Sequence, residues 1–314
     1  MTTGYANPEV LAETAWLQDH LGDPAVRVVE CDEDPGAHCR GHIPGAVQLD
    51  WRTDLNDARV RDLVDARTFE RLMGRFGITA ETSVVLYGDQ ANWWAAYAYW
   101  AMRLFGHERL RLLNGGRKKW VLEGRATTDD PTRVEESHYV VVAANPGIRA
   151  LRADVLLHIG SPAHRQPVVR LPAGHVLVDV RTPAEFSGRL VQMAGYPQEG
   201  ALRGGHIPGA ANVPWGRAVH DDWTFRSPVE LRRLYEGAGV ASDKDVVVYC
   251  RIGERSAHTW FVLHELMGYR RVRNYDGSWT EWGNSVGLPI SNPSLVKGMP
   301  RQAGIAAASR APVH

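Results

Sequence analysis

VVVYCRIGERS, from Val246 to Ser256, is the stretch that decides the fold of this 314-residue chain. Its apolar start is typical of a buried strand, and a lone cysteine, Cys250, follows where that strand should end. A tight loop and a helix are expected next. Ligands collect at the carboxyl ends of strands in α/β sheets, so Cys250 stands where a reactive thiolate would be built. Inward-facing N–H groups of the loop and the start of the helix are expected to lower the pKa of this thiol.

The chain carries the same landmarks twice. GHIPGAV at 41–47 returns as GHIPGAA at 205–211, and SVVLYGD at 83–89 returns as DVVVYCR at 245–251. Each motif lies 162 or 164 residues from its copy, and the order of the motifs is kept. Such self-similarity indicates duplication, and a chain of this length accommodates two copies of one α/β domain.

The two copies differ at the nucleophile. Gly88 occupies the position of Cys250 in the first copy, where the loop reads GDQANWW. Glycine has no side chain that can attack a substrate. Covalent chemistry is therefore expected only in the C-terminal half.

Strands and helices alternate in each half, which predicts an α/β fold with an open parallel sheet and helices on both faces. The expected strands are 26–30, 84–87, 175–180 and 246–249, and the expected helices are 92–104, 228–236 and 256–267. Ser256 is the expected N-cap of the last helix. The predicted divisions are a first domain at 1–125, a linker at 126–147, a second domain at 148–290 and a mobile tail at 291–314.

Composition indicates a soluble globular enzyme. The 36 basic and 36 acidic residues balance, so no bulk charge favours nucleic acid or an anionic membrane as a partner. A transmembrane run and a signal peptide are both missing, which predicts a cytoplasmic protein. Cys31, Cys39 and Cys250 lack metal-ligand spacing, so no metal site is expected. Cys31 and Cys39 could pair under oxidation, but two ordinary thiols are the preferred interpretation.

Four motifs together resemble one family. They are the paired GHIPGA motifs, LVDVRTPAEFSG at 177–188, YCRIGERS at 249–256 and NYDGSWTEW at 274–282. This combination resembles the two-domain rhodaneses, which are thiosulfate sulfurtransferases, and is most similar to the actinobacterial ones. The resemblance extends from about Val10 to about Ile290. It implies tandem rhodanese-like domains, the first inactive and the second catalytic.

The resemblance also implies a double displacement. Cys250 would take the outer sulfur of thiosulfate, release sulfite and hold the sulfur as a persulfide. A thiophilic acceptor, either cyanide or a cellular thiol, would then remove it. No metal or organic cofactor is implied.

The substrate-binding residues that the resemblance assigns lie mainly in the loop: Arg251, Ile252, Gly253, Glu254, Arg255 and Ser256, with Arg181 as a weaker candidate. Two contacts of the mitochondrial enzymes, whose loop reads CRKGVT, are missing, because Ile252 replaces a lysine and Glu185 aligns with an arginine. Donor binding is therefore assigned to Arg251 and Arg255. Glu254 would oppose a dianionic donor, so its side chain is expected to point to solvent.

Several other residues have mainly structural interpretations. His42 and His206 occur in both copies, so they are expected to fix the GHIPG turns. Asp179 and Arg181 are expected to brace the active loop as a hydrogen-bonded pair, with structural and functional roles both open. Trp93, Trp94 and Trp215 align with aromatic residues of the mitochondrial enzymes that line the pocket between the domains, and are assigned to the pocket rim.

Three alternative functions would also use Cys250. Cysteine phosphatases and arsenate reductases of related fold need a longer loop with arginine six positions after the cysteine, where this chain has Ser256. The 3-mercaptopyruvate sulfurtransferases share fold and nucleophile but typically read CGSGVT, without an arginine at the position of Arg251. A non-enzymatic persulfide carrier would use the same Cys250.

Overall fold

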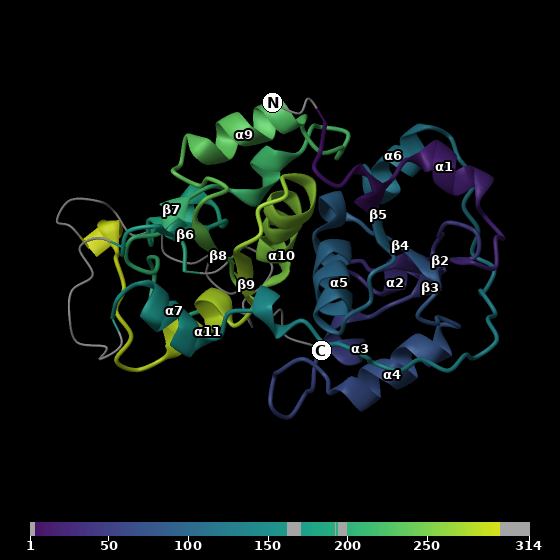
Figure 1. The fold of residues 1–314 in the computed structure, drawn as a ribbon, viewed down its shortest axis with the longest axis horizontal. Helices are drawn as coiled ribbons and strands as arrows, with labels where there is room; N and C mark the ends of the chain where they lie inside the picture. The colour runs from purple at the N-terminus through teal and green to yellow at the C-terminus, as the bar shows by residue number, and fades with distance from the viewer. Residues whose placement is uncertain (1–3, 162–170, 192, 194–199, 296–314) are drawn as a thin grey trace, which may run out of the picture.

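The computed structural model describes residues 4–161, 171–191, 193 and 200–295, and Figure 1 shows them as two lobes that follow one another along the chain. Each lobe is built on one all-parallel sheet. The described chain therefore has the predicted tandem α/β architecture.

The N-terminal sheet has five strands in the order β1-β5-β4-β2-β3. Its strands are β1 (Leu11–Ala12), β2 (Val26–Glu30), β3 (Val47–Gln48), β4 (Ser83–Tyr87) and β5 (Leu110–Leu113). The helices of this domain are α1 (Thr14–Asp19), α2 (Gly36–Cys39), α3 (Trp51–Asp54), α4 (Ala66–Arg75), α5 (Trp93–Leu104) and α6 (Gly116–Leu122).

The C-terminal sheet has four strands in the order β7-β6-β8-β9. Its strands are β6 (His175–Asp179), β7 (Ala211–Asn212), β8 (Asp245–Tyr249) and β9 (Val272–Tyr275). The helices are α7 (Arg152–His158), α8 (Pro183–Phe186), α9 (Pro228–Glu236), α10 (Glu254–Trp260) and α11 (Ser278–Asn284), and a π-helix, η6 (Phe261–Leu266), continues α10.

Both faces of each sheet are buried, and alternate side chains of a strand pack into different apolar clusters. On β8, Val246 and Val248 pack into one apolar cluster, whereas Val247 and Tyr249 pack into another. This double burial explains why the strand reads as a continuous apolar run in the sequence.

The two domains share a continuous core. Helices α5 and α10 lie side by side between the sheets (Figure 1). Tyr99 meets Phe261 edge to face with ring centroids 4.9 Å apart, and the Arg103 guanidinium lies 3.3 Å from the buried Glu265 carboxylate. Burial of this kind favours a fixed arrangement of the domains.

The segment between the domains lies along the first of them. Residues 129–145 contain no helix or strand and cross the N-terminal domain in an irregular path. Backbone hydrogen bonds join Ser137 to Gly74 and Asn145 to Leu104. The described part of the predicted tail pairs Ser291 with His206 and ends in a short 3-10 helix, η7 (Pro293–Leu295). The predicted mobility of 296–314 lies outside the described residues.

The two GHIPG turns have the same supports. The Tyr87 hydroxyl accepts a hydrogen bond from the Ile43 backbone N–H at 2.9 Å, and the Tyr249 hydroxyl accepts one from the Ile207 N–H at 3.0 Å. In each domain, the tyrosine at the end of the central strand therefore holds the GHIPG turn of the same domain.

The repeated histidines contact backbone. His42 Nδ1 lies 2.9 Å from the His38 carbonyl oxygen, and His206 Nδ1 lies 2.8 Å from the Phe186 carbonyl oxygen. The His206 ring also stacks on Phe186. These contacts support the structural interpretation of both histidines.

The predicted helix 256–267 starts too late, and its second half is the π-helix η6 and not a regular α-helix. Gly253, with φ of +103°, is the N-cap, so α10 begins two residues earlier than expected. Ser256 lies inside the first turn, where its hydroxyl donates to the Gly253 carbonyl at 3.1 Å. Only glycine fits at position 253, because a Cβ there would approach the Asp276 Cα to 2.7 Å.

Across the described ranges, the chain forms no helix with both the length and the apolar character needed to cross a bilayer.

Candidate active site

The loop that follows β8 is held in place by residues 276–280, which begin with the sequence DGSW. Cys250 donates its backbone N–H to the Ser278 hydroxyl at 3.0 Å, and the Trp279 N–H donates to the Cys250 carbonyl at 3.1 Å. Thr280 N–H donates to the Arg251 carbonyl at 2.9 Å. The start of α11 therefore fixes the backbone of the nucleophile.

Ser278 has a left-handed backbone, with φ of +53°, and its counterpart in the first copy, Gly116, has the same φ. A serine in this conformation is uncommon. Two hydrogen bonds of its hydroxyl offset the cost of this conformation: the hydroxyl accepts from the Cys250 N–H and donates to the Tyr275 carbonyl at 2.7 Å. Serine where the repeat has glycine is the sequence signal that would have identified this contact.

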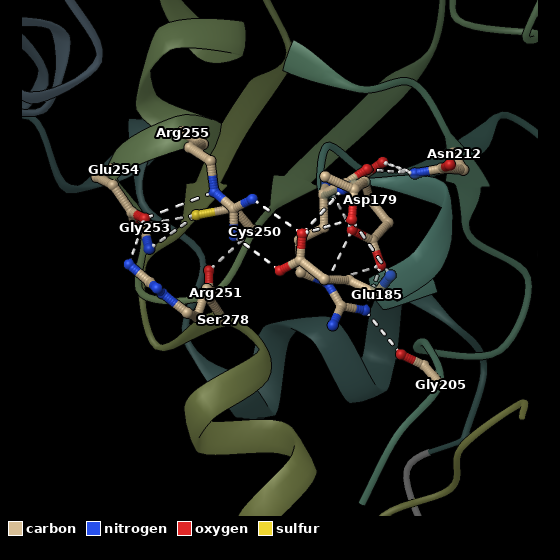
Figure 2. A network of polar contacts seen from close by, with 12 residues as sticks. Asp179, Glu185, Gly205, Asn212, Cys250, Arg251, Gly253, Glu254, Arg255 and Ser278 are labelled. Carbon is tan, nitrogen blue, oxygen red and sulfur yellow. Dashed lines mark hydrogen bonds and ion pairs between the residues drawn. The ribbon is translucent and has the colours of Figure 1, made fainter. Parts of the chain in front are cut away.

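The Cys250 thiol is completely buried, and Glu254 and Gly253 are among its polar neighbours (Figure 2). The Gly253 backbone N–H donates to Sγ at 3.2 Å. The thiol donates to Oε2 of Glu254, also at 3.2 Å. The sulfur is thus held between an amide donor and a carboxylate acceptor.

Burial raises the pKa of the Cys250 thiol above its usual value, and the Glu254 carboxylate raises it further. Arg255 and hydrogen bonds from Ser256 act in the opposite direction but do not reverse the shift. The expected lowering of the thiol pKa is therefore wrong for the resting site. Desolvation and a neighbouring anion outweigh the loop amide.

The predicted direction of Glu254 is also wrong. Its side chain is fully buried and turns toward the sulfur. Oε1 faces two guanidinium groups, with Arg251 Nη2 at 3.5 Å and Arg255 Nε at 3.6 Å. Two cations close by make it possible for a carboxylate to stay buried next to a thiol.

Arg255 forms a buried ion pair with Glu185 of α8. Both guanidinium nitrogens Nη1 and Nη2 donate to the carboxylate at 3.1 Å (Figure 2). Burial alone would raise the pKa of Glu185, but Arg255 and hydrogen bonds from Thr182 lower it to about 2. The carboxylate that takes the place of a family arginine therefore fixes the loop arginine.

Arg181 pairs with Asp179, as expected, and its Nη2 lies 2.6 Å from Oδ2 of that carboxylate. The same guanidinium donates to the Gly205 carbonyl at 2.7 Å and lies 4.6 Å from the centre of the Trp279 ring. It thereby braces the second GHIPG turn and the residue that holds the Cys250 carbonyl. These contacts support the structural side of the open interpretation.

The charges around Cys250 are matched in pairs. Arg251 and Arg255 face Glu254, Arg255 also faces Glu185, and Arg181 faces Asp179. The loop assignments of Arg251, Ile252, Gly253, Glu254, Arg255 and Ser256 to substrate binding stay predictions, as does that of Arg181. Ile252 is half-buried, and the other five of these loop residues are buried with the thiol.

A cleft of about 850 Å³ lies between the domains beside the loop. Ile252, Tyr275 and Arg149 line it from the C-terminal domain, and Trp51, Asn56 and Tyr97 line it from the N-terminal domain. The Arg149 guanidinium spans the cleft, at 2.6 Å from Asp62 and 2.8 Å from Asp276. Of the loop residues 250–256, Ile252 is the one that lines this cleft.

The three predicted rim tryptophans lie near the domain interface but are not part of the cleft lining. Trp93 contacts Trp215 with ring centroids 5.2 Å apart, and Trp94 stacks on Trp51 at 4.0 Å. Trp51 reaches the cleft instead. Trp51 and Tyr97 are not among the predicted site residues, because helix spacing in α3 and α5 does not show which face meets the other domain.

The first copy of the loop is closed to a nucleophile. A Cβ atom at Gly88 would lie 2.2 Å from the Cys31 carbonyl oxygen. Asn92, at the position of Glu254, accepts from the Gly88 N–H at 3.0 Å. The packing of this copy therefore excludes a side chain at position 88.

Gly88→Cys is accordingly expected to destabilise the protein by about 1–3 kcal/mol, as overpacking of a closed site does. In a Cys250→Ser background it should not restore sulfur transfer. Chemical denaturation and turnover assays of the single and double variants check both statements. Turnover by the double variant would show that the first copy is a site that lacks only its nucleophile.

Cys31 is buried and Cys39 is exposed, and both are free thiols. Burial raises the pKa of Cys31 well above its usual value. In the part of the chain that the structure describes, no three His, Cys, Asp or Glu side chains gather as metal ligands would.

The chain matches a known protein family over most of its length. The model of the rhodanese-like domain matches residues 13–123 and 165–285. The chain is 55% identical to "Sulfur carrier protein TtuD" of Thermus thermophilus, over 92% of this chain and 98% of that protein. It is 52% identical to "Putative thiosulfate sulfurtransferase SseA" of Mycobacterium tuberculosis, over 92% of each chain.

A solved structure agrees with the fold. The 3-mercaptopyruvate sulfotransferase SseA of Escherichia coli superposes with a TM-score of 0.72 at 26% identity. The match covers 86% of this chain and 98% of that one. Both domains thus have a counterpart in a protein of known structure.

Proposed function

Because the chain belongs to the rhodanese family of sulfurtransferases, we propose that it transfers the outer sulfur of thiosulfate through a persulfide on Cys250. Cyanide or a cellular thiol is the acceptor, and sulfite is the first product. The observation that carries the proposal is the position of Cys250 Sγ, buried at the end of a strand with the Gly253 N–H directed at it. We propose a cytoplasmic reaction between small molecules, without nucleic acid, membrane or cofactor.

The chemistry needs two displacements at one sulfur atom. In the first, Cys250 Sγ attacks the outer sulfur of thiosulfate, the S–S bond of the donor breaks, and sulfite leaves with the electron pair. In the second, the acceptor attacks the sulfur held on Cys250 and Sγ takes back the electron pair. A buried site protects the persulfide from water and from unrelated thiols between the two steps.

Two other functions remain in competition. Transfer from 3-mercaptopyruvate has the support of the related Escherichia coli structure. Persulfide delivery to a partner protein has the support of the Thermus relative and of the paired charges in the site, which offer a dianion no excess positive charge. Thiosulfate is favoured by Arg251, where the mercaptopyruvate enzymes typically have a small residue.

The experiment is thiocyanate formation from cyanide with thiosulfate and 3-mercaptopyruvate as parallel donors. Higher kcat/KM with thiosulfate supports the proposal, and higher kcat/KM with 3-mercaptopyruvate overturns its donor. Persulfide formation without turnover by either small acceptor indicates a carrier.

Arg251→Gly is expected to lower kcat/KM for thiosulfate by about tenfold to a hundredfold. A charge-assisted hydrogen bond at a buried site is worth about 1.5–3 kcal/mol, and about 1.4 kcal/mol corresponds to a factor of ten. The loss for 3-mercaptopyruvate, which has a single carboxylate charge, should be smaller. Arg217→Gly is a control for the loss of an arginine outside the loop, because Arg217 is an exposed residue of the 3-10 helix η5 (Trp215–Ala218) and does not line the cleft beside the loop. Equal losses for both donors would mean that Arg251 does not select the donor.

A further inference from the structure

Glu254 is the one carboxylate that the structure places in direct contact with the Cys250 sulfur among the described residues. Its Oε2 atom is 3.2 Å from Sγ, and the thiol is the donor. Neither group has any contact with solvent. A proton that leaves this thiol therefore has a carboxylate at hydrogen-bond distance, and neither group is exposed to bulk solvent.

We propose that Glu254 is the general base that removes the Cys250 proton during attack and returns it when the sulfur is delivered. This inference rests on the proposed function and adds a catalytic residue to it. The geometry meets the first requirement of a base, which is hydrogen-bond reach to the proton that it takes.

The proton balance supports this role. In the first step the Glu254 carboxylate takes the thiol proton as the Sγ–S bond forms and sulfite leaves, so a persulfide anion faces a neutral carboxyl. In the second step the acceptor takes the outer sulfur, the Sγ–S bond breaks, and Glu254 returns its proton to Sγ. The thiol and carboxyl together carry one negative charge before and after each step.

Constant charge matters because the surrounding groups are fixed. Arg251 and Arg255 face Oε1 of Glu254 from the loop and α10, and Glu185 of α8 holds Arg255 from the other side. From the N-terminal domain, Tyr97 of α5 lies within electrostatic range of this carboxylate: burial is the main cause that raises the pKa of Tyr97, and the Glu254 charge adds a small part. A persulfide anion next to an ionised Glu254 would add a second buried negative charge to the same two cations, which desolvation opposes.

The comparison of the two copies agrees with a coupled role. The first copy has Gly88 at the position of Cys250 and Asn92 at the position of Glu254. The Asn92 amide serves the backbone, because it accepts from the Gly88 N–H and donates to the Leu113 carbonyl at 2.7 Å. Nucleophile and carboxylate are thus present together or absent together.

The test is the rate at which iodoacetamide alkylates Cys250 between pH 5.5 and 9.5, followed by mass spectrometry of the Cys250 peptide. Attack assisted by an ionised carboxylate does not depend on pH in the neutral range, whereas attack by a free thiolate rises tenfold per pH unit until the thiol has ionised. The wild type should give the flat profile.

Glu254→Gln keeps the size of the side chain and cannot accept the proton. Its rate should rise tenfold per pH unit and be about a thousandfold lower than that of the wild type at pH 6, within the usual range for loss of a general base. At pH 9 the two rates should converge. Glu265→Gln is the matched control, because Glu265 is also buried on the same helical segment but pairs with Arg103, so its profile should match the wild type.

Several results would contradict the role of Glu254 as the base. A wild-type rate that rises tenfold per pH unit overturns the proposal without any variant. A Glu254→Gln rate that exceeds the wild type at every pH also overturns it, because Glu254 would then only disfavour the thiolate. If Glu254→Gln does not fold, Glu254→Asp, which keeps the carboxylate but withdraws it from Sγ, should be slowed at pH 6 and keep a flat profile, and an unchanged rate would contradict the proposal.

Alkylation needs no sulfur donor, so the two hypotheses can fail separately. A flat wild-type profile with no persulfide from either donor leaves Glu254 as the base and removes the proposed function. A persulfide on Cys250 together with an alkylation rate that rises tenfold per pH unit would support the proposed function and overturn the role of Glu254 as the base.

Discussion

Cys250→Ser is expected to reduce thiocyanate formation to background with every donor while the circular dichroism spectrum stays the same. The serine hydroxyl is close in size to the thiol and can keep the bonds to Gly253 and Glu254, so the fold should survive. Oxygen cannot hold the transferred sulfur as a persulfide. Turnover and circular dichroism of the purified variant are the two measurements.

The controls for this prediction are the other two thiols. Cys31→Ser and Cys39→Ser should keep the turnover of the wild type, because neither side chain belongs to the loop after β8. Substantial turnover by Cys250→Ser, or its loss in Cys39→Ser, would move the chemistry away from Cys250.

Glu185→Gln is expected to lower the free energy of unfolding by about 3 kcal/mol at neutral pH. The substitution leaves the Arg255 guanidinium buried with only the more distant Glu254 as a counter-charge, and breaking a buried ion pair costs about 3–5 kcal/mol. A loss of about the same size follows from the pKa of Glu185, which the folded protein lowers to about 2. Chemical denaturation measures the difference.

The pH dependence of this difference has a defined sign. A carboxyl whose pKa is lowered by folding stabilises the protein above its unfolded pKa, and the contribution is lost as pH falls toward the folded value. The gap between the wild type and Glu185→Gln should therefore be largest at neutral pH and shrink from about pH 5 to about pH 2.

Glu230→Gln provides a matched control for the ion pair. Glu185 and Glu230 both close a capping box at the start of a helix, with Thr182 and Ser227 respectively, but Glu185 is buried whereas the Glu230 side chain is 42% exposed. Its substitution should cost far less than that of Glu185. Equal costs would assign the effect to the cap and not to the buried pair with Arg255.

The architecture could be read from the sequence because its signals are local and repeated. Two signals predicted the tandem parallel sheets: the apolar runs at β4 and β8, and the two GHIPG motifs. Gly88, at the position that corresponds to Cys250, predicted the asymmetry between the domains. The repeated tyrosine has the same structural reason in each copy, since Tyr87 and Tyr249 hold the same turn. Because the same turn needs the same tyrosine in both domains, the motif and the tyrosine appear twice in the sequence.

The electrostatics of the site could not be read in the same way. The sequence shows Glu254 four residues after Cys250, but the spacing alone does not say whether a carboxylate faces solvent or sulfur. The partner of Arg255 lies 70 residues away, at Glu185, where sequence comparison shows only a missing arginine. Ion pairs between distant segments leave no local pattern, so the cations looked available for a donor when they are already matched.

The most direct test of the account is mass spectrometry of the protein after one equivalent of thiosulfate, with the modified peptide identified. The account predicts one added sulfur atom, located on the peptide that contains Cys250 and removed by cyanide. Sulfur on Cys31 or Cys39, or an unmodified Cys250 after treatment with both thiosulfate and 3-mercaptopyruvate, would contradict it.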